Sequence, residues 1–93
     1  MTLTEYLDRV TDQASFYAFV AALIADREQE VDIEKRTPSS PYGPGANGWE
    51  NGTIEAYLEA ALSCASDNGD NMLQEKPSWA AFATFLYCGK IYE

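Results

Sequence analysis

Two stretches of the chain, each of which begins a helix beside a tryptophan, decide the fold: Trp49-Glu50-Asn51-Gly52-Thr53-Ile54-Glu55-Ala56-Tyr57-Leu58-Glu59-Ala60-Ala61 and Ser78-Trp79-Ala80-Ala81-Phe82-Ala83. In the first stretch, Asn51 is predicted to be the N-cap of a helix, because apolar residues recur at helical spacing after it. Pro77 is predicted to open the second helix, where its missing N–H costs nothing. The predicted apolar positions are Ile54, Tyr57, Leu58, Ala61, Leu62 and Ala65 in the first helix and Trp79, Phe82, Ala83 and Leu86 in the second.

Residues near the ends of these helices are predicted to have structural roles. Trp49 lies two residues before Asn51, close to the position of a hydrophobic staple. Trp79 is expected to hold the last helix against Trp49. Tyr92 is large and apolar enough that we expect the end of the chain to be docked instead of frayed. Lys90 is expected to meet the negative end of the last helix's dipole.

The residues before Trp49 predict two further helices. Thr2 or Thr4 is expected to begin a short helix, and Thr11 is expected to cap a longer one. Residues 31–36 either continue the second helix or form a short strand. Val31-Asp32-Ile33 alternates like a strand but has no obvious mate, so we expect this stretch to be irregular. The apolar positions are Leu3, Tyr6, Leu7 and Val10 in the first helix and Phe16, Phe19, Val20 and Leu23 in the second.

A long irregular connection separates the second and third predicted helices. Residues 37–48 hold three prolines and three glycines, which exclude regular structure. Such a loop is either a flexible insertion, which we predict, or a binding element that presents Tyr42. The chain as a whole is predicted to be mostly α, a single domain over residues 1–93 in which about four helices form a compact bundle.

Charge limits the classes of partner. The chain has 15 acidic and 6 basic residues, a net charge of −9. Such a surface repels nucleic acid and anionic membranes and favours a basic protein partner. The alternative is that the negative charge has no role except to keep the protein soluble. The predicted partner contacts are Glu28, Glu30, Asp32, Glu34, Tyr42 and Glu50.

Catalytic chemistry is not indicated. The chain has no histidine, and its two cysteines have no basic neighbour that would activate a thiolate. No glycine-rich phosphate loop precedes a helix, and the acids of residues 67–75 do not have the spacing of a calcium loop. We therefore expect no catalytic residue, no metal and no cofactor, and we predict that the protein is not an enzyme.

The setting predicted for the chain is the cytoplasm. No export leader and no apolar run long enough to cross a bilayer is found in the sequence. Cys64 and Cys88 are expected to be small buried thiols, although a disulfide between two facing helices is geometrically possible. A homodimer is also possible, because exposed aromatics would serve self-association as well as partner binding.

The chain also resembles a known family. The residues that carry the resemblance are Phe16-Tyr17-Ala18-Phe19-Val20-Ala21-Ala22-Leu23-Ile24-Ala25-Asp26, Trp49-Glu50-Asn51, Thr53-Ile54-Glu55-Ala56-Tyr57-Leu58-Glu59-Ala60, Trp79-Ala80-Ala81-Phe82-Ala83 and Lys90-Ile91-Tyr92-Glu93. Together they resemble an uncharacterised family of small bacterial domains of unknown function, which implies a single-domain architecture and transfers no catalytic residue. The loop before Trp49 is longer than the family needs, and Leu62 or Ser63 stands where a tryptophan is expected.

Three functional classes follow from these observations. The first, which we favour, is a non-catalytic protein-binding or inhibitory protein, such as an immunity protein or an acidic antagonist of a basic partner. The second is a small-molecule-binding domain or minor enzyme with a pocket near Trp49, Tyr57 and Trp79. The third is an accessory domain whose charge serves only solubility.

Overall fold

The computed structural model describes residues 1–41, 43–67 and 77–92. It contains four helices and, within those ranges, no strand: α1 (Leu3–Asp8), α2 (Gln13–Arg36), α3 (Ile54–Asp67) and α4 (Trp79–Ile91). The predicted fold class, a mostly α bundle of four helices, is confirmed. Residues 37–41 and 43–48 contain no helix or strand, as their composition predicts, and Tyr42 lies outside the described residues.

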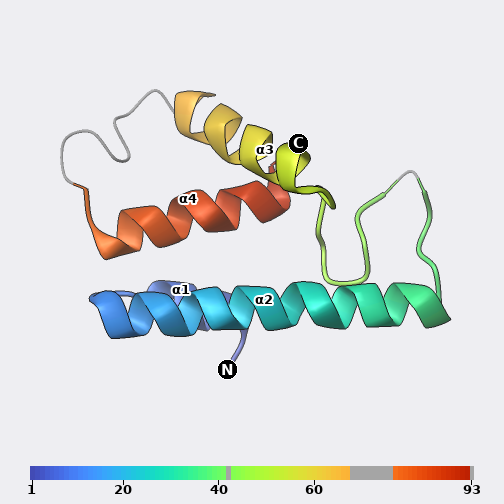
Figure 1. Cartoon of the computed structure of the whole chain (residues 1–93), viewed down its shortest axis with the longest axis horizontal. Helices are drawn as coiled ribbons and strands as arrows, with labels where there is room; N and C mark the ends of the chain where they lie inside the picture. The colour runs from blue at the N-terminus through green and yellow to red at the C-terminus, as the bar shows by residue number, and fades with distance from the viewer. Residues whose placement is uncertain (42, 68–76, 93) are drawn as a thin grey trace.

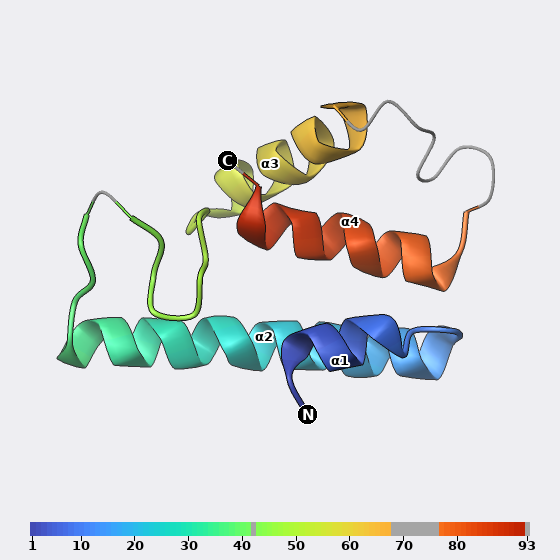
Figure 2. The same cartoon turned by 180° about the vertical axis from the view of Figure 1, so that it is seen from behind.

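The helices form three layers, with α4 in the middle. Figures 1 and 2 show α1 beside α2 on one side of α4 and α3 on the other side. In the part of the chain that is described, α3 packs on no helix except α4. One side of α3 therefore has no neighbouring helix, and this arrangement positions the candidate site.

The start and the end of α2 differ from the prediction. The N-cap is Asp12, not Thr11, because the Asp12 carboxylate accepts the Ser15 N–H at 2.9 Å. Residues 31–36 continue the helix, so the prediction that they are irregular is wrong. The strong helix formers at its end sustain it, and it stops at Thr37 because the following proline disfavours helical geometry there.

The caps of α3 and α4 also differ from the prediction. The Thr53 hydroxyl accepts the Ala56 N–H at 3.1 Å, so Thr53 and not Asn51 caps α3. Ser78 caps α4 by accepting the Ala81 N–H at 3.0 Å, and the helix begins after this cap, not at Pro77. The α1 prediction is confirmed, because Thr2 is its N-cap.

Asn51 binds backbone carbonyl groups at the C-terminal end of α4. Its side-chain amide donates to the carbonyl oxygens of Gly89 at 3.0 Å and Tyr92 at 2.8 Å, which a helix end otherwise leaves without partners. The Glu50 N–H donates to the Lys90 carbonyl at 2.9 Å. The Tyr92 hydroxyl donates to the Asp67 carboxylate, so the end of α4 is tied both to α3 and to the segment before it.

The core is small and lies where α2 and α4 meet. Phe19, Leu23, Trp49 and Ala83 belong to it, and Phe19 and Ala83 are completely buried. Trp79 remains 37% exposed and stacks on Phe16, with ring centroids 5.4 Å apart. The expectation that Trp79 locks α4 onto Trp49 is therefore wrong, because the two tryptophans have different ring partners.

Close contact between α3 and α4 depends on Gly89. A Cβ at this position would lie 2.7 Å from the Tyr57 ring, so only glycine leaves room for that ring. The Tyr57 hydroxyl donates to the Leu86 carbonyl at 2.6 Å. Burial raises the pKa of Tyr57 to about 12.

Cys64 and Cys88 are free thiols that meet between α3 and α4, so the alternative of a disulfide is not realised. Burial, followed by the hydrogen bond with Cys64, raises the pKa of the Cys88 thiol to about 12. A thiol with that pKa is protonated at neutral pH and is a poor nucleophile. Cys64 is buried, as the sequence predicts, whereas Cys88 is half-buried.

Candidate functional site

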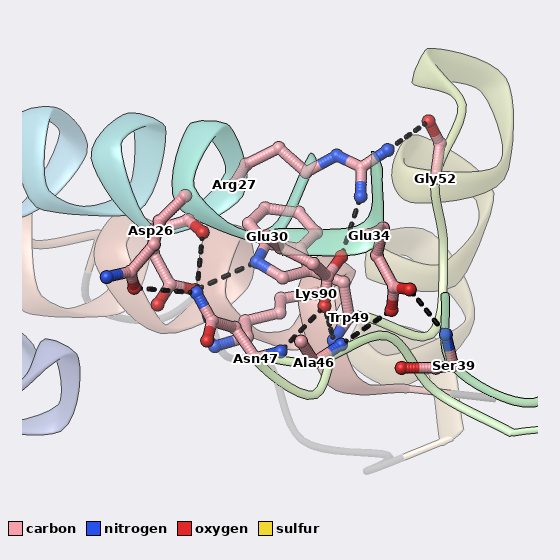
Figure 3. A network of polar contacts seen from close by, with 11 residues as sticks. Asp26, Arg27, Glu30, Glu34, Ser39, Ala46, Asn47, Trp49, Gly52 and Lys90 are labelled. Atoms are coloured by element: carbon pink, nitrogen blue, oxygen red, sulfur yellow. Dashed lines mark hydrogen bonds and ion pairs between the residues drawn. The ribbon is translucent and has the colours of Figure 1, made fainter. Parts of the chain in front are cut away.

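One face of α2 carries a row of three carboxylates. Asp26, Glu30 and Glu34 are spaced four residues apart, so they lie one above another along the helix. Figure 3 shows all three pointing toward the segment that follows the helix. We call these three residues the carboxylate row; it binds the chain's own loop.

Glu30 is the centre of the row. Its side chain is buried, the residue being 1% exposed, and it accepts the N–H groups of Asn47 at 2.9 Å and Trp49 at 3.2 Å. Arg27 supplies the compensating charge through Nη1 at 2.7 Å. A buried carboxylate with three donors of this kind is satisfied, and removing Arg27 would leave its charge uncompensated.

Glu34 holds the two ends of the loop. Its carboxylate accepts the Ser39 N–H at 2.6 Å and the Ala46 N–H at 2.9 Å. Hydrogen bonds from Ser39, together with the one from Ala46, lower the pKa of this carboxyl. The loop that we predicted to be flexible is thus held to α2 at both of its ends.

Asp26 joins the row to α4. Its carboxylate accepts the Trp49 indole N–H at 2.8 Å and the Lys90 ammonium at 2.7 Å. Lys90 is buried, and its Nζ lies 5.7 Å from the centre of the Trp49 ring. The prediction that Lys90 meets the end of its own helix is wrong, because Asp26 offers a partly buried ionic partner.

The predicted partner contacts do not form one surface. Glu30 and Glu34 bind the loop, so Glu30 in particular has no surface to offer a partner. Glu50 is half-buried, and Asp32 is exposed and lies 3.5 Å from Arg36. Glu28 is exposed at the edge of a groove. Asp26 was not predicted as a site residue. The signal that could have identified it is the regular spacing of four residues between acids on a helix that precedes a glycine-rich loop.

The groove lies between α2 and α3 and has a volume of about 480 Å³. Trp49 and Tyr57, whose ring centroids are 5.9 Å apart, are two of its lining residues. Trp79 does not line it. Of the predicted pocket residues, the structure therefore brings together Trp49 and Tyr57 but not Trp79. The lining residues are Leu23, Ile24, Arg27, Glu28, Trp49, Asn51, Gly52, Thr53, Ile54, Tyr57 and Leu58.

The edges of the groove are apolar and exposed. Ile24 on α2 is 56% exposed, and Ile54 and Leu58 on α3 are 78% and 46% exposed. Leu62, 62% exposed, continues the same line along α3. Ile24, Ile54 and Leu58 all line the groove, so its edges offer exposed apolar side chains to a ligand.

The charge beside the groove is negative. Glu28 lines it, and Glu55 and Glu59 are exposed on α3 next to the apolar line. Arg27 is the one basic residue in the lining, and its Nη2 donates to the Gly52 carbonyl at 3.3 Å while Nη1 binds Glu30. The Arg27 charge is therefore paired within the fold, whereas Glu28, Glu55 and Glu59 are exposed acids beside the groove.

The charged residues that line the groove are Glu28 and Arg27, and Arg27 is bound to Glu30. Among the residues that the structure describes, no three acids or cysteines gather as a metal site would require. Within the same part of the chain, no buried side-chain polar atom lacks a hydrogen-bond partner. No described helix has both the length and the apolarity needed to cross a membrane. The arrangement offers shape, apolar area and charge, which are the means of binding.

Comparison with protein families identifies the family of this chain. The model of a family of unknown function (DUF7660) matches residues 12–93, and the chain belongs to this family. The match covers α2, α3 and α4 and leaves α1 outside. No curated protein and no solved structure matches the chain. The predicted membership of an uncharacterised family is confirmed, and the function has to be argued from the groove.

Proposed function

We propose that this member of the DUF7660 family is a non-catalytic binding protein whose groove between α2 and α3 receives part of a basic partner protein. The observation that carries the proposal is the exposed apolar line of Ile54, Leu58 and Leu62 beside a groove with an acidic edge. Apolar anchors surrounded by charge are the composition of a protein interface.

Electrostatics support a basic partner over a second copy of the chain. A symmetric dimer through the groove would bring Glu28, Glu55 and Glu59 of both copies together, and like charges at an interface are costly. The net charge of −9 attracts a cationic surface from a distance and speeds encounter at low salt. Covering the basic surface of a target would make the protein an inhibitor, in the manner of an immunity protein.

A small-molecule ligand is the second candidate function. The groove volume of about 480 Å³ falls within the range of drug-sized ligand pockets. The two aromatic rings of Trp49 and Tyr57 would provide the apolar contact, and a ligand of this kind would stabilise the fold by mass action.

Affinity capture from a lysate at low and high salt tests the proposal. The wild-type protein and the Glu55→Lys variant are compared as baits, with Asp8→Lys as the matched control, because Asp8 is exposed on α1 and does not line the groove. We expect a stoichiometric basic protein that Glu55→Lys loses and Asp8→Lys retains, and that high salt releases.

Two results would contradict the proposal. Equal loss of the captured protein in both variants would mean that net charge alone attracts it. Capture of nothing, combined with a metabolite that raises the melting temperature of wild type and not of Leu58→Glu, would favour the small-molecule function.

A further inference from the structure

The exposed apolar residues of α3 form a helical ridge. Ile54, Leu58 and Leu62 are spaced by four, so they lie in one i, i+4, i+8 row. Eight residues of helix span about 12 Å, which gives the row the length of about two turns. All three side chains are exposed, whereas Ala60, Ala61 and Cys64 of the same helix are buried.

Across the groove, α2 presents a shorter row of one apolar and one acidic residue. Ile24 and Glu28 are one turn apart, and both line the groove. The described parts of α2 and α3 do not pack on each other, so the two rows flank a trough whose lining includes Trp49 and Tyr57. Rows of this spacing on two helices are the surface into which the side chains of another helix fit.

The backbone around the groove favours a helix over an extended segment. An extended peptide gains most of its affinity by pairing its N–H and C=O groups with the edge of a sheet. Within residues 1–41, 43–67 and 77–92 there is no strand that could supply such an edge. A helix satisfies its own backbone and needs only side-chain contacts, which the groove provides.

The charge defines the flanks of that helix. Glu28 on one side and Glu55 and Glu59 on the other are exposed, and Arg27 is already bound to Glu30. Lysine or arginine beside the apolar residues of the ligand would meet carboxylates on both sides. A ligand helix with acidic flanks, including α3 of a second copy, would be repelled.

We propose that the groove binds an amphipathic helix of a partner protein, with apolar residues at i, i+4 and i+7 and basic residues on both flanks. This inference rests on the proposed protein-binding function and names the element that enters the groove. The helix lies along Ile54, Leu58 and Leu62 and places one large apolar side chain over Trp49 and Tyr57.

A displayed library of random peptides tests the proposal without knowledge of the partner. Peptides of about 16 residues, or about 24 Å when helical, are long enough to cover the row. The library is selected against the wild-type protein and depleted against Leu58→Glu, so that only groove-dependent sequences remain. Leu62→Glu replaces Leu58→Glu if the latter does not fold, and Tyr17→Glu is the control, because Tyr17 is exposed on α2 and does not line the groove.

We expect the enriched peptides to carry apolar residues at helical spacing with lysine or arginine beside them, and to gain helical circular dichroism when bound. Their affinity should fall at least about tenfold in Leu58→Glu and stay unchanged in Tyr17→Glu.

Other outcomes separate the two proposals. Groove-dependent peptides that alternate apolar and polar residues, or that bind without becoming helical, would overturn the helical ligand and leave the protein-binding function standing. Enriched peptides that are neutral or acidic would overturn the basic flanks. No enrichment over Leu58→Glu would overturn both the helical ligand and the groove as a protein-binding site.

Discussion

The two sides of this molecule use acidic and apolar residues in opposite ways. On α2, the acids Asp26, Glu30 and Glu34 turn inward and bind the loop that follows. On α3, the apolar residues Ile54 and Leu58 turn outward. This difference shows that residue type alone does not determine whether a side chain is buried or exposed in a small helical protein. Packing partners do, since a loop with many unpaired N–H groups attracts carboxylates and a helix with one neighbour leaves a side uncovered.

The largest loss of stability is expected when the contacts between the carboxylate row and the end of α4 are removed. Deletion of Lys90–Glu93 removes the Lys90 partner of Asp26 and the Tyr92 carbonyl that Asn51 binds. We expect the unfolding free energy to fall by more than about 3 kcal/mol, the usual effect of breaking a buried ion pair. Urea unfolding followed by circular dichroism measures this. An unchanged midpoint would mean that the tail contributes nothing to the fold.

A buried acid and an exposed acid on the same helix sharpen the comparison. Glu30→Ala leaves Arg27 and two backbone N–H groups without their acceptor, and we expect a loss of about 3 kcal/mol. Glu28→Ala, two residues earlier, should change stability by less than about 0.5 kcal/mol because its side chain is exposed. Equal effects in chemical denaturation would contradict the role assigned to the row.

The contact between α3 and α4 provides a steric test. Gly89→Ala would place a Cβ against the Tyr57 ring, and overpacking of this kind costs about 1–3 kcal/mol. Gly43→Ala is the control, because a Cβ there has no neighbour within 4 Å. Thermal unfolding of both variants compares the two sites. A Gly89→Ala protein as stable as Gly43→Ala would mean that the helices separate at little cost.

Alkaline pH probes the same contact through Tyr57. The folded pKa of Tyr57 is raised from 10.0 to about 12, so its contribution is complete below pH 10 and is lost as the pH rises toward 12. Unfolding free energies measured from pH 9 to pH 12 should therefore decline. Tyr57→Phe should decline less steeply, because its side chain does not titrate. Parallel slopes in both proteins would assign the decline to other groups.

The smallest effect on stability is expected on the outward side. Ile54→Ser and Leu62→Ser remove exposed apolar groups, so unfolding free energy should change by less than about 0.5 kcal/mol. Binding of the partner should nevertheless weaken, which calorimetry with the captured protein would show. A large loss of stability would mean that these side chains belong to the core.

Much of the fold was predictable from local sequence. Helical spacing, the prolines of residues 37–48 and the apolar content of α4 are local signals, and they predict four helices and the long connection correctly. Caps were less predictable, because Asp12 and Thr53 compete with Thr11 and Asn51, which have similar capping ability. Of the residues that line the groove, Trp49 and Tyr57 were predicted as pocket residues and Glu28 as a partner contact.

The sequence by itself determined the helical class, the acidity and the scarcity of catalytic groups, because these depend on composition and short-range spacing. Only the tertiary structure decided where individual side chains point. Glu30 is buried because loop N–H groups reach it, Asn51 leaves α3 to cap α4, and Leu58 stays exposed. These outcomes depend on contacts between residues far apart in the chain, whose free energies exceed the local preferences that a sequence displays.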